Sequence, residues 1–160
     1  MIEVGENLPE FKFSVPMPDG VKPMGTAELF AGKTVALFAV PGAFTPTCSV
    51  KHLPSFREKA AELRARGVDL IACTSVNDLH VLSAWAKDQG VFGDILMLAD
   101  GNADFAKALG LDADFSKFGM GPRSKRYSMI VKDGVVETLN VEEAGEYKVS
   151  SAEYMLGQLS

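Results

Sequence analysis

Two apolar segments constrain most strongly how this chain can fold. Residues 33–40 read KTVALFAV and residues 68–74 read VDLIACT. Neither segment alternates polar and apolar positions, so each is typical of a strand that is covered on both faces. The segment from Cys48 to about Arg66 has apolar residues at three- and four-residue spacing and ends before Gly67, which indicates a helix. A strand, a helix and a second strand in this order predict parallel pairing in an α/β sheet.

The rest of the chain continues this alternation. Pro54 predicts a kink or an irregular first turn in the helix that begins at Cys48. Asp133-Gly134, between two β-favouring runs, predicts a hairpin. The later predicted elements are a helix that Asn77 caps and that runs through Lys87, a strand at 95–98, a helix at 102–109, an irregular segment at 117–125, strands at 127–132 and 135–141, and a helix from Ser151. This order predicts a thioredoxin fold, an α/β/α three-layer sandwich with a mixed central sheet, in one domain over residues 1–160.

The composition narrows the classes of function. The chain has 160 residues and a net charge of −5, from 16 basic and 21 acidic residues, which gives no support to a nucleic-acid or anionic-membrane partner. No apolar run approaches the roughly 18 residues of a membrane span. The first residues lack the basic start and apolar core of a secretory signal, and two cysteines do not make a disulfide scaffold. We therefore expect a cytoplasmic protein.

Cys48 lies in a distinctive setting, near the end of the loop PGAFTPTCS. The loop leads from the first predicted strand into the predicted helix, where unpaired N–H groups and the helix dipole stabilise negative charge. A cysteine at this place is stabilised as a thiolate, which is the nucleophilic form. The alternative is a small apolar core residue, which is common for free cysteines but needs no loop rich in proline and threonine.

Cys73 lies on the second predicted strand, which returns to the sheet edge that carries Cys48. A shared edge does not bring two cysteines within the roughly 4.4–6.8 Å between Cα atoms that a disulfide needs. We expect a larger gap in the folded state, so that bonding would require the start of the helix to unwind. The apolar strand favours a packed core thiol at Cys73.

Pro41, Thr45 and Cys48 have the spacing Pro-x-x-x-Thr-x-x-Cys, and here the chain resembles the peroxiredoxins. Longer matches cover most of the chain and resemble the type II (peroxiredoxin 5-like) branch, which is linked to glutathione and glutaredoxin; they are PGAFTPTCS with HLPSF, VDLIACTSVNDLHVLSAW, ILMLADGNADFAKALG and SKRYSMIVKDGVVETLNVE. The resemblance implies a thioredoxin-fold, thiol-dependent peroxidase of cell redox homeostasis. Its implied substrates are hydrogen peroxide, organic hydroperoxides and often peroxynitrite. It also implies that no metal or organic cofactor is needed.

The resemblance gives each site residue a role. Cys48 is the expected peroxidatic cysteine, whose thiolate attacks a peroxide oxygen and becomes a sulfenic acid. Arg126 is expected to hold thiolate and peroxide together, with Arg123 as the rival. Thr45 is expected to hydrogen-bond the peroxide and Pro41 to shield the thiolate from water. Backbone N–H groups at the helix start are expected to complete an anion-binding cradle.

The thiol that reduces the Cys48 sulfenic acid could come from either of two sources. One branch of the family carries a resolving cysteine near the C-terminus, but residues 146–154 read EYKVSSAEY and contain none. Cys73 matches the second cysteine of the plant-like type II enzymes and could resolve Cys48. Alternatively, glutathione, glutaredoxin or thioredoxin attacks the sulfenic acid directly. We expect glutathione or glutaredoxin to do so, because a buried strand makes Cys73 hard to reach.

The resemblance also implies a homodimer. Phe44 and Phe118, with neighbouring glycines, could supply part of its surface. The alternative is that both phenylalanines face the core of their own chain or line the pocket.

Three other classes of function stay open at this point. His52 follows Cys48 by one helical turn, which would suit the Cys–His pair of a cysteine hydrolase, although no orienting third residue is evident. A zinc site would use Cys48, His52, Cys73 and His80, but their spacing fits no compact zinc pattern. The third class is a redox relay or binding protein whose Cys48 becomes oxidised without catalytic turnover. Steady-state peroxide consumption separates it from an enzyme.

Overall fold

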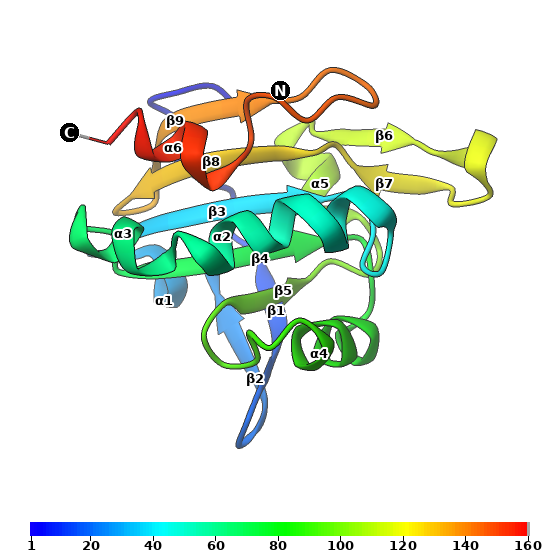
Figure 1. Ribbon diagram of the computed structural model, residues 1–160, viewed down its shortest axis with the longest axis horizontal. Helices are drawn as coiled ribbons and strands as arrows, with labels where there is room; N and C mark the ends of the chain where they lie inside the picture. The colour runs from blue at the N-terminus through cyan, green and yellow to red at the C-terminus, as the bar shows by residue number, and fades with distance from the viewer. Residues whose placement is uncertain (160) are drawn as a thin grey trace.

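The computed structural model describes residues 1–159 and contains a seven-stranded mixed sheet (Figure 1). Its strands lie in the order β2-β1-β5-β4-β3-β8-β9. Their bounds are β1 (Lys12–Met17), β2 (Gly20–Gly25), β3 (Thr34–Val40), β4 (Leu70–Ser75), β5 (Leu96–Ala99), β8 (Tyr127–Lys132) and β9 (Val135–Val141). The central pairs β3–β4 and β4–β5 are parallel, and the outer pairs are antiparallel. The predicted mixed sheet is therefore confirmed.

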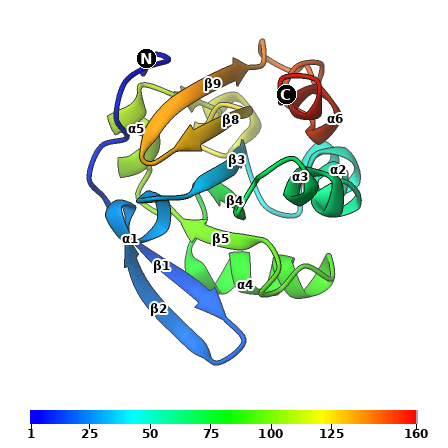
Figure 2. The ribbon, with the colours of Figure 1, turned by 90° about the vertical axis from the view of Figure 1, so that its left-hand side faces the viewer.

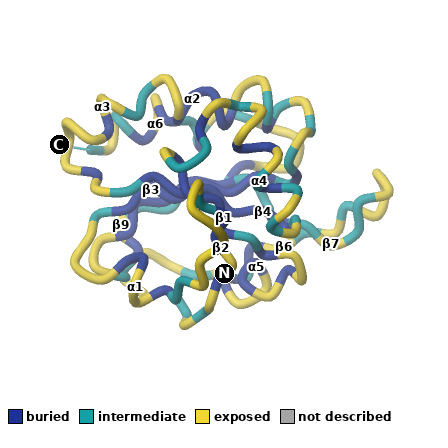
Figure 3. The backbone as a smooth tube through the Cα atoms, turned by 90° about the horizontal axis from the view of Figure 1, so that it is seen from below, coloured by how far each residue is buried: buried dark blue, intermediate teal, exposed yellow. Residues whose placement is uncertain are grey.

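Helices cover both faces of the sheet (Figure 2 and Figure 3). Their bounds are α1 (Thr26–Phe30), α2 (Leu53–Glu58), α3 (Ala60–Ala65), α4 (Leu79–Asp88), α5 (Asp104–Leu109) and α6 (Ala152–Leu156). The first core lies under α2, α3, α4 and α6, and the second lies under α1 and α5. Neighbouring residues of β3 divide between them, with Phe38 in the first core and Leu37 in the second. This division explains the unbroken apolar run and confirms the three-layer sandwich.

Residues 1–32, for which we predicted no element, contain the hairpin β1–β2 and α1. Pro16 and Pro23 obscure the strand pattern, because proline cannot donate a hydrogen bond to a ladder. Both positions tolerate the loss. β2 is at the edge of the sheet, and β1 meets β5 at Ser14, before Pro16.

The helix predicted from Cys48 to about Arg66 is divided into three parts. It begins as a π-helical turn, η1 (Cys48–His52), which agrees with the irregular start that Pro54 predicted. Pro54 itself is in the first turn of α2, directly after the π-helical turn. An unpredicted break at Lys59, whose φ and ψ are −99° and 7°, separates α2 from α3.

The prediction that Asn77 caps α4 is wrong by one residue. Asp78 is the cap, and its carboxylate accepts hydrogen bonds from the backbone N–H groups of His80 and Val81. Both residues are good caps, so the choice between them depends on what else Asn77 can bind. Asn77 Oδ1 instead accepts a hydrogen bond from the backbone N–H of Ala43, in the loop that leads to Cys48.

The segment 117–125 is also more regular than predicted. β7 (Pro122–Ser124) pairs antiparallel with β6 (Asp112–Asp114) in a separate two-stranded ribbon, and the short 3₁₀ turn η2 (Ser116–Phe118) lies between them. Strands of three residues are too short to show a period in the sequence. Over the described range, no helix combines the length and apolar character needed to cross a bilayer.

Candidate active site

The loop between β3 and Cys48 is held by its own contacts. Thr45 Oγ1 donates a hydrogen bond to the Gly42 carbonyl over 2.7 Å. The Ala43 N–H is bound by Asn77 Oδ1 at 2.9 Å, which ties the loop to the segment after β4. A Cβ at Gly42 would lie 3.2 Å from atoms of three neighbouring side chains, so any larger residue there would require these side chains to shift. The loop therefore presents Cys48 in a fixed place.

Cys48 is the first residue of η1, and its side chain is fully buried at 0% exposure. Within residues 1–159, neither its backbone N–H nor that of Thr47 donates to a backbone acceptor. The first N–H groups of a helix have no acceptor inside the helix and bind anions readily. The start of this turn can therefore bind negative charge beside the sulfur.

Arg126 reaches Cys48 from a distant part of the sequence. It directly precedes β8, whose Tyr127 pairs with Ala39 of β3, so Arg126 lies beside the end of β3. Its Nη2 donates a hydrogen bond to Cys48 Sγ over 3.1 Å. No carboxylate forms an ion pair with Arg126 in the described part of the chain. Its positive charge is therefore directed at the sulfur without a competing anion.

His52 holds the other side of the Arg126 guanidinium. Its Nε2 lies 2.9 Å from the Ser150 carbonyl, and its Nδ1 lies 2.9 Å from Arg126 Nη1. A carbonyl can only accept and a guanidinium can only donate, so the proton is on Nε2 and Nδ1 is the acceptor. Burial, followed by the nearby Arg126 charge, lowers the pKa of His52 to about 3. The imidazole is therefore neutral and orients Arg126 without cancelling its charge.

Arg123, the alternative to Arg126, donates hydrogen bonds to backbone carbonyls. Its Nε donates to the Met120 carbonyl over 3.0 Å and its Nη1 donates to the Val76 carbonyl over 3.1 Å. A longer contact of 3.5 Å reaches the Pro41 carbonyl. Arg123 therefore links the Cys48 loop to two neighbouring segments, whereas Arg126 contacts the sulfur.

Comparisons with known proteins identify the family to which this site belongs. The family model described as Redoxin matches residues 3–156. The chain belongs to the Redoxin family. Within that family it is a peroxiredoxin of the type II branch, and peroxiredoxins are thiol-dependent peroxidases.

Relatives and solved structures support this placement. Chloroplastic peroxiredoxin-2E-2 of Oryza sativa subsp. japonica is 52% identical over 163 residues, which cover 99% of this chain and 72% of that protein. Peroxiredoxin-2B of Arabidopsis thaliana is 44% identical over 159 residues, 99% of this chain and 98% of that protein. Reduced Prx3 from Vibrio vulnificus, in complex with hydrogen peroxide, is 52% identical with a TM-score of 0.95, and the match covers 100% of both chains.

Cys73 of this peroxiredoxin is a buried thiol on β4. It pairs with Phe38 of β3, belongs to the same apolar core as Cys48, and is 0% exposed. Both cysteines are free. Burial, with a smaller contribution from the Cys48 charge, raises the pKa of Cys73, and this outweighs the opposite effect of Arg126. Cys73 is therefore protonated at neutral pH and is a poor nucleophile.

A cavity of about 340 Å³ lies beside the site. Its lining includes Pro41, Thr47, Lys125 and Arg126, together with the acidic residues Glu142, Glu143 and Glu146. This peroxiredoxin therefore has room for a small polar molecule next to Arg126.

Several contacts around the site have no signal in the sequence. Ser150 binds His52, and Trp85 Nε1 donates to Ser49 Oγ over 2.9 Å. These pairs join residues 98 and 36 positions apart, so no local spacing could indicate them. His80 is exposed at the start of α4. In residues 1–159 no cluster of three or more histidine, cysteine or acidic residues could hold a metal ion.

Proposed function

We propose that Cys48 is the peroxidatic cysteine of this peroxiredoxin. Its thiolate attacks one oxygen of the hydroperoxide, the O–O bond breaks, and the other oxygen leaves as an alkoxide or hydroxide that takes up a proton. Cys48 is oxidised to a sulfenic acid and the peroxide is reduced to an alcohol or water. The observation that carries the proposal is the 3.1 Å hydrogen bond from Arg126 to Cys48 Sγ. Hydrogen peroxide as a substrate is supported by the complex of the related Vibrio vulnificus Prx3.

The neighbouring groups suit this reaction. Arg126 stabilises the thiolate and the negative charge that develops on the leaving oxygen. The Thr45 hydroxyl donates its hydrogen to Gly42, so its lone pairs are left to accept the peroxide O–H. The free N–H groups of Thr47 and Cys48 face developing negative charge at the start of η1. Pro41, which lines the cavity, limits access of water to the buried sulfur.

For the second half of the cycle we propose an external thiol, either glutathione or glutaredoxin. The incoming thiolate attacks the Cys48 sulfenic acid, water leaves, and a mixed disulfide forms. A second external thiol then releases reduced Cys48 and takes the disulfide away. Two observations favour this route over Cys73. Cys73 is fully buried and its pKa is raised by burial, so it supplies little thiolate. The cavity beside Arg126 leaves room for an external thiol to approach the site.

Intact-mass measurement tests both halves. The reduced protein receives one equivalent of hydrogen peroxide in the presence of a sulfenic-acid trap. An adduct on Cys48 supports the proposed cycle with an external thiol. A Cys48–Cys73 disulfide would replace the external route by an internal one. If Cys48 stays reduced while peroxide persists, Cys48 is not the peroxidatic residue.

We also propose that two copies of this chain associate through the face that carries Phe44 and Phe118. The two side chains are 53% and 69% exposed, which is unusual for phenylalanine and supports an interface. Phe118→Glu should shift the protein from dimer to monomer in light scattering coupled to gel filtration. A wild-type protein that is already monomeric at high concentration would exclude the proposal.

A further inference from the structure

The chain of contacts behind Cys48 extends beyond His52 to a buried carboxylate. Glu142 directly follows β9 and is 8% exposed. Its backbone N–H donates to the Arg126 carbonyl over 3.0 Å, so the two residues are adjacent across the sheet edge. Glu142 is thus fixed beside the arginine that contacts the sulfur. Its carboxylate, however, is turned toward a different partner.

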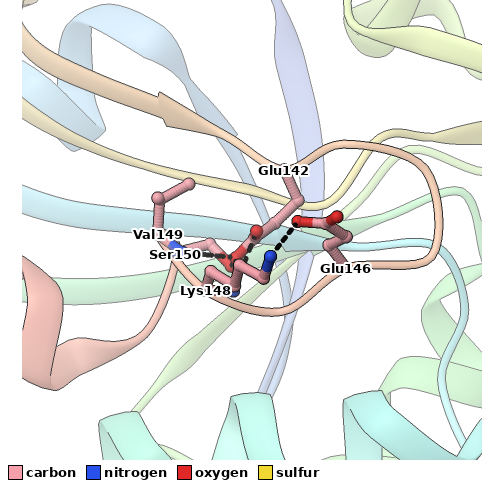
Figure 4. A network of polar contacts seen from close by, with 5 residues as sticks. All are labelled: Glu142, Glu146, Lys148, Val149 and Ser150. Carbon is pink, nitrogen blue, oxygen red and sulfur yellow. Dashed lines mark hydrogen bonds and ion pairs between the residues drawn. The ribbon is translucent and has the colours of Figure 1, made fainter.

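Glu142 binds three consecutive backbone N–H groups of the segment that follows β9 (Figure 4). Its Oε2 accepts from the N–H groups of Lys148, Val149 and Ser150, each over 2.8 Å. The same oxygen accepts from Ser150 Oγ over 2.6 Å. Successive N–H groups that converge in this way form an anion-binding concavity. The 142–150 loop is therefore closed onto itself by one carboxylate.

This arrangement keeps Glu142 charged while it is buried. Burial raises the pKa of its carboxyl, but the hydrogen bond from Ser150 Oγ and those from the three backbone N–H groups outweigh that effect, and the pKa is lowered overall. The ammonium of Lys148 does not take part, because it pairs with Glu146 over 3.1 Å at the surface. The charge of Glu142 is thus satisfied by the loop and is not drawn to Arg126.

The residue held by this carboxylate is also the one that fixes His52. Ser150 is fully buried, donates twice to Glu142, and presents its carbonyl to His52 Nε2 over 2.9 Å. The contacts run without a gap from Glu142 through Ser150 and His52 to Arg126, and from there to Cys48. Each link has one donor and one acceptor, so the orientation of every member depends on the one before it.

We propose that Glu142 is a positioning residue of this peroxidase site. By holding Ser150, it selects the His52 tautomer whose Nδ1 accepts from Arg126, and so aims the guanidinium at Cys48. Loss of the Glu142 carboxylate frees the Ser150 carbonyl and lets His52 and Arg126 rotate. Glu142 does not touch the substrate in this arrangement. The proposal rests on the peroxidase activity of the Cys48–Arg126 pair.

Glu142→Gln is the decisive variant, because the amide has the same shape but cannot accept all the hydrogen bonds that converge on Oε2. We expect the second-order rate constant for Cys48 oxidation by hydrogen peroxide to fall by about tenfold to a hundredfold. Glu137→Gln, at an exposed position of β9, removes the same charge nearby and should match the wild type.

The position of the His52 proton distinguishes positioning from a merely structural role. Nitrogen NMR of wild-type protein should show the proton on Nε2, and Glu142→Gln should show a mixture of tautomers. If Glu142→Gln only lowers the melting temperature, while its oxidation rate and tautomer match those of Glu137→Gln, the proposal is overturned. If Cys48 does not react with peroxide even in wild-type protein, the proposed function fails instead.

If Glu142→Gln does not fold, Ser150→Ala is the variant that tests the proposal. It removes one hydrogen bond to the carboxylate and leaves the three from the backbone, so the same changes should occur to a smaller extent. A Ser150→Ala protein with a wild-type oxidation rate and tautomer would contradict the proposal.

Discussion

Trp85 donates its indole N–H to the hydroxyl of Ser49, the residue next to Cys48, over 2.9 Å. Trp85 is the chain's single tryptophan and is fully buried on α4. Any rearrangement of η1 on oxidation should break this bond, so the intrinsic fluorescence should change as Cys48 reacts. Stopped-flow fluorescence with hydrogen peroxide measures this. Ser49→Ala removes the acceptor of this hydrogen bond. The fluorescence of the reduced variant should therefore already resemble that of the oxidised wild-type protein. An emission that stays constant while mass spectrometry shows oxidised Cys48 would mean that η1 does not move.

The two arginines should differ sharply when each is replaced. Arg126→Gln removes the donor to Cys48 Sγ, so the rate of Cys48 oxidation should fall by about a hundredfold to a thousandfold. Arg126→Lys keeps a charge but loses the fork that holds His52 and sulfur together, and should be intermediate. Arg123→Gln removes the donor to the Met120 and Val76 carbonyls and should mainly lower thermal stability. Peroxide kinetics and melting curves on the same three proteins check this. Equal kinetic losses for both glutamine variants would assign Arg123 a direct part in the reaction.

Stability should fall as the pH drops below the ordinary range of histidine. The pKa of His52 is about 3 in the folded protein and about 6.5 in an unfolded chain. The unfolded state therefore binds more protons between these values, and the contribution of His52 to stability, complete above pH 6.5, is lost as the pH falls toward 3. The slope approaches about 1.4 kcal/mol per pH unit.

Urea unfolding between pH 6.5 and 5 isolates this effect, since carboxyl groups titrate mostly at lower pH. The wild type should lose up to about 2 kcal/mol over this interval. His52→Gln should lose much less, whereas His80→Gln, at the exposed histidine of α4, should behave as the wild type. A wild-type protein whose stability is flat across this interval would show that His52 titrates normally.

Cys73→Ala should leave peroxidase turnover with glutathione and glutaredoxin close to the wild-type rate, because the proposed cycle does not use Cys73. The substitution removes a fully buried sulfur and should cost about 1 kcal/mol of folding stability. Coupled peroxidase assays and denaturant unfolding give the two quantities. A turnover rate that collapses in Cys73→Ala, with Cys48 still oxidised at the normal rate, would show that Cys73 resolves the sulfenic acid.

The parts of the fold that could be predicted are those that sequence period and turn chemistry determine. β3, β4 and the β8–β9 hairpin follow from apolar runs and from Asp133-Gly134. The hairpin β1–β2 was missed because proline interrupts its pattern, and the β6–β7 ribbon because its strands have three residues each. The N-cap of α4 was misplaced by one residue because Asn77 and Asp78 have similar cap preferences, and a tertiary contact with Ala43 decides between them.

The residues of the site also divide into those that the local sequence indicates and those that it does not. Pro41, Thr45 and Cys48 lie within eight residues, so their spacing alone marks them. Arg126 came from the family resemblance, since nothing in its own surroundings directs it to a residue 78 positions earlier. His52 was noticed for its spacing from Cys48, but as a possible base. Its actual partners, 74 and 98 positions away, depend on how β8 and the 142–150 loop meet the sheet edge.

The absence of a carboxylate partner for Arg126 within residues 1–159 affects the order of events in the proposed cycle. While Cys48 is a thiolate, its negative charge and the positive charge of Arg126 neutralise each other. Conversion of the thiolate into a neutral sulfenic acid removes the counter-ion of Arg126, which is half-buried and lines the cavity. In the proposed cycle the site therefore repels an anionic thiol less at the one stage when it needs a reductant. In that cycle, oxidation by peroxide itself favours the approach of the thiol that reduces Cys48 again.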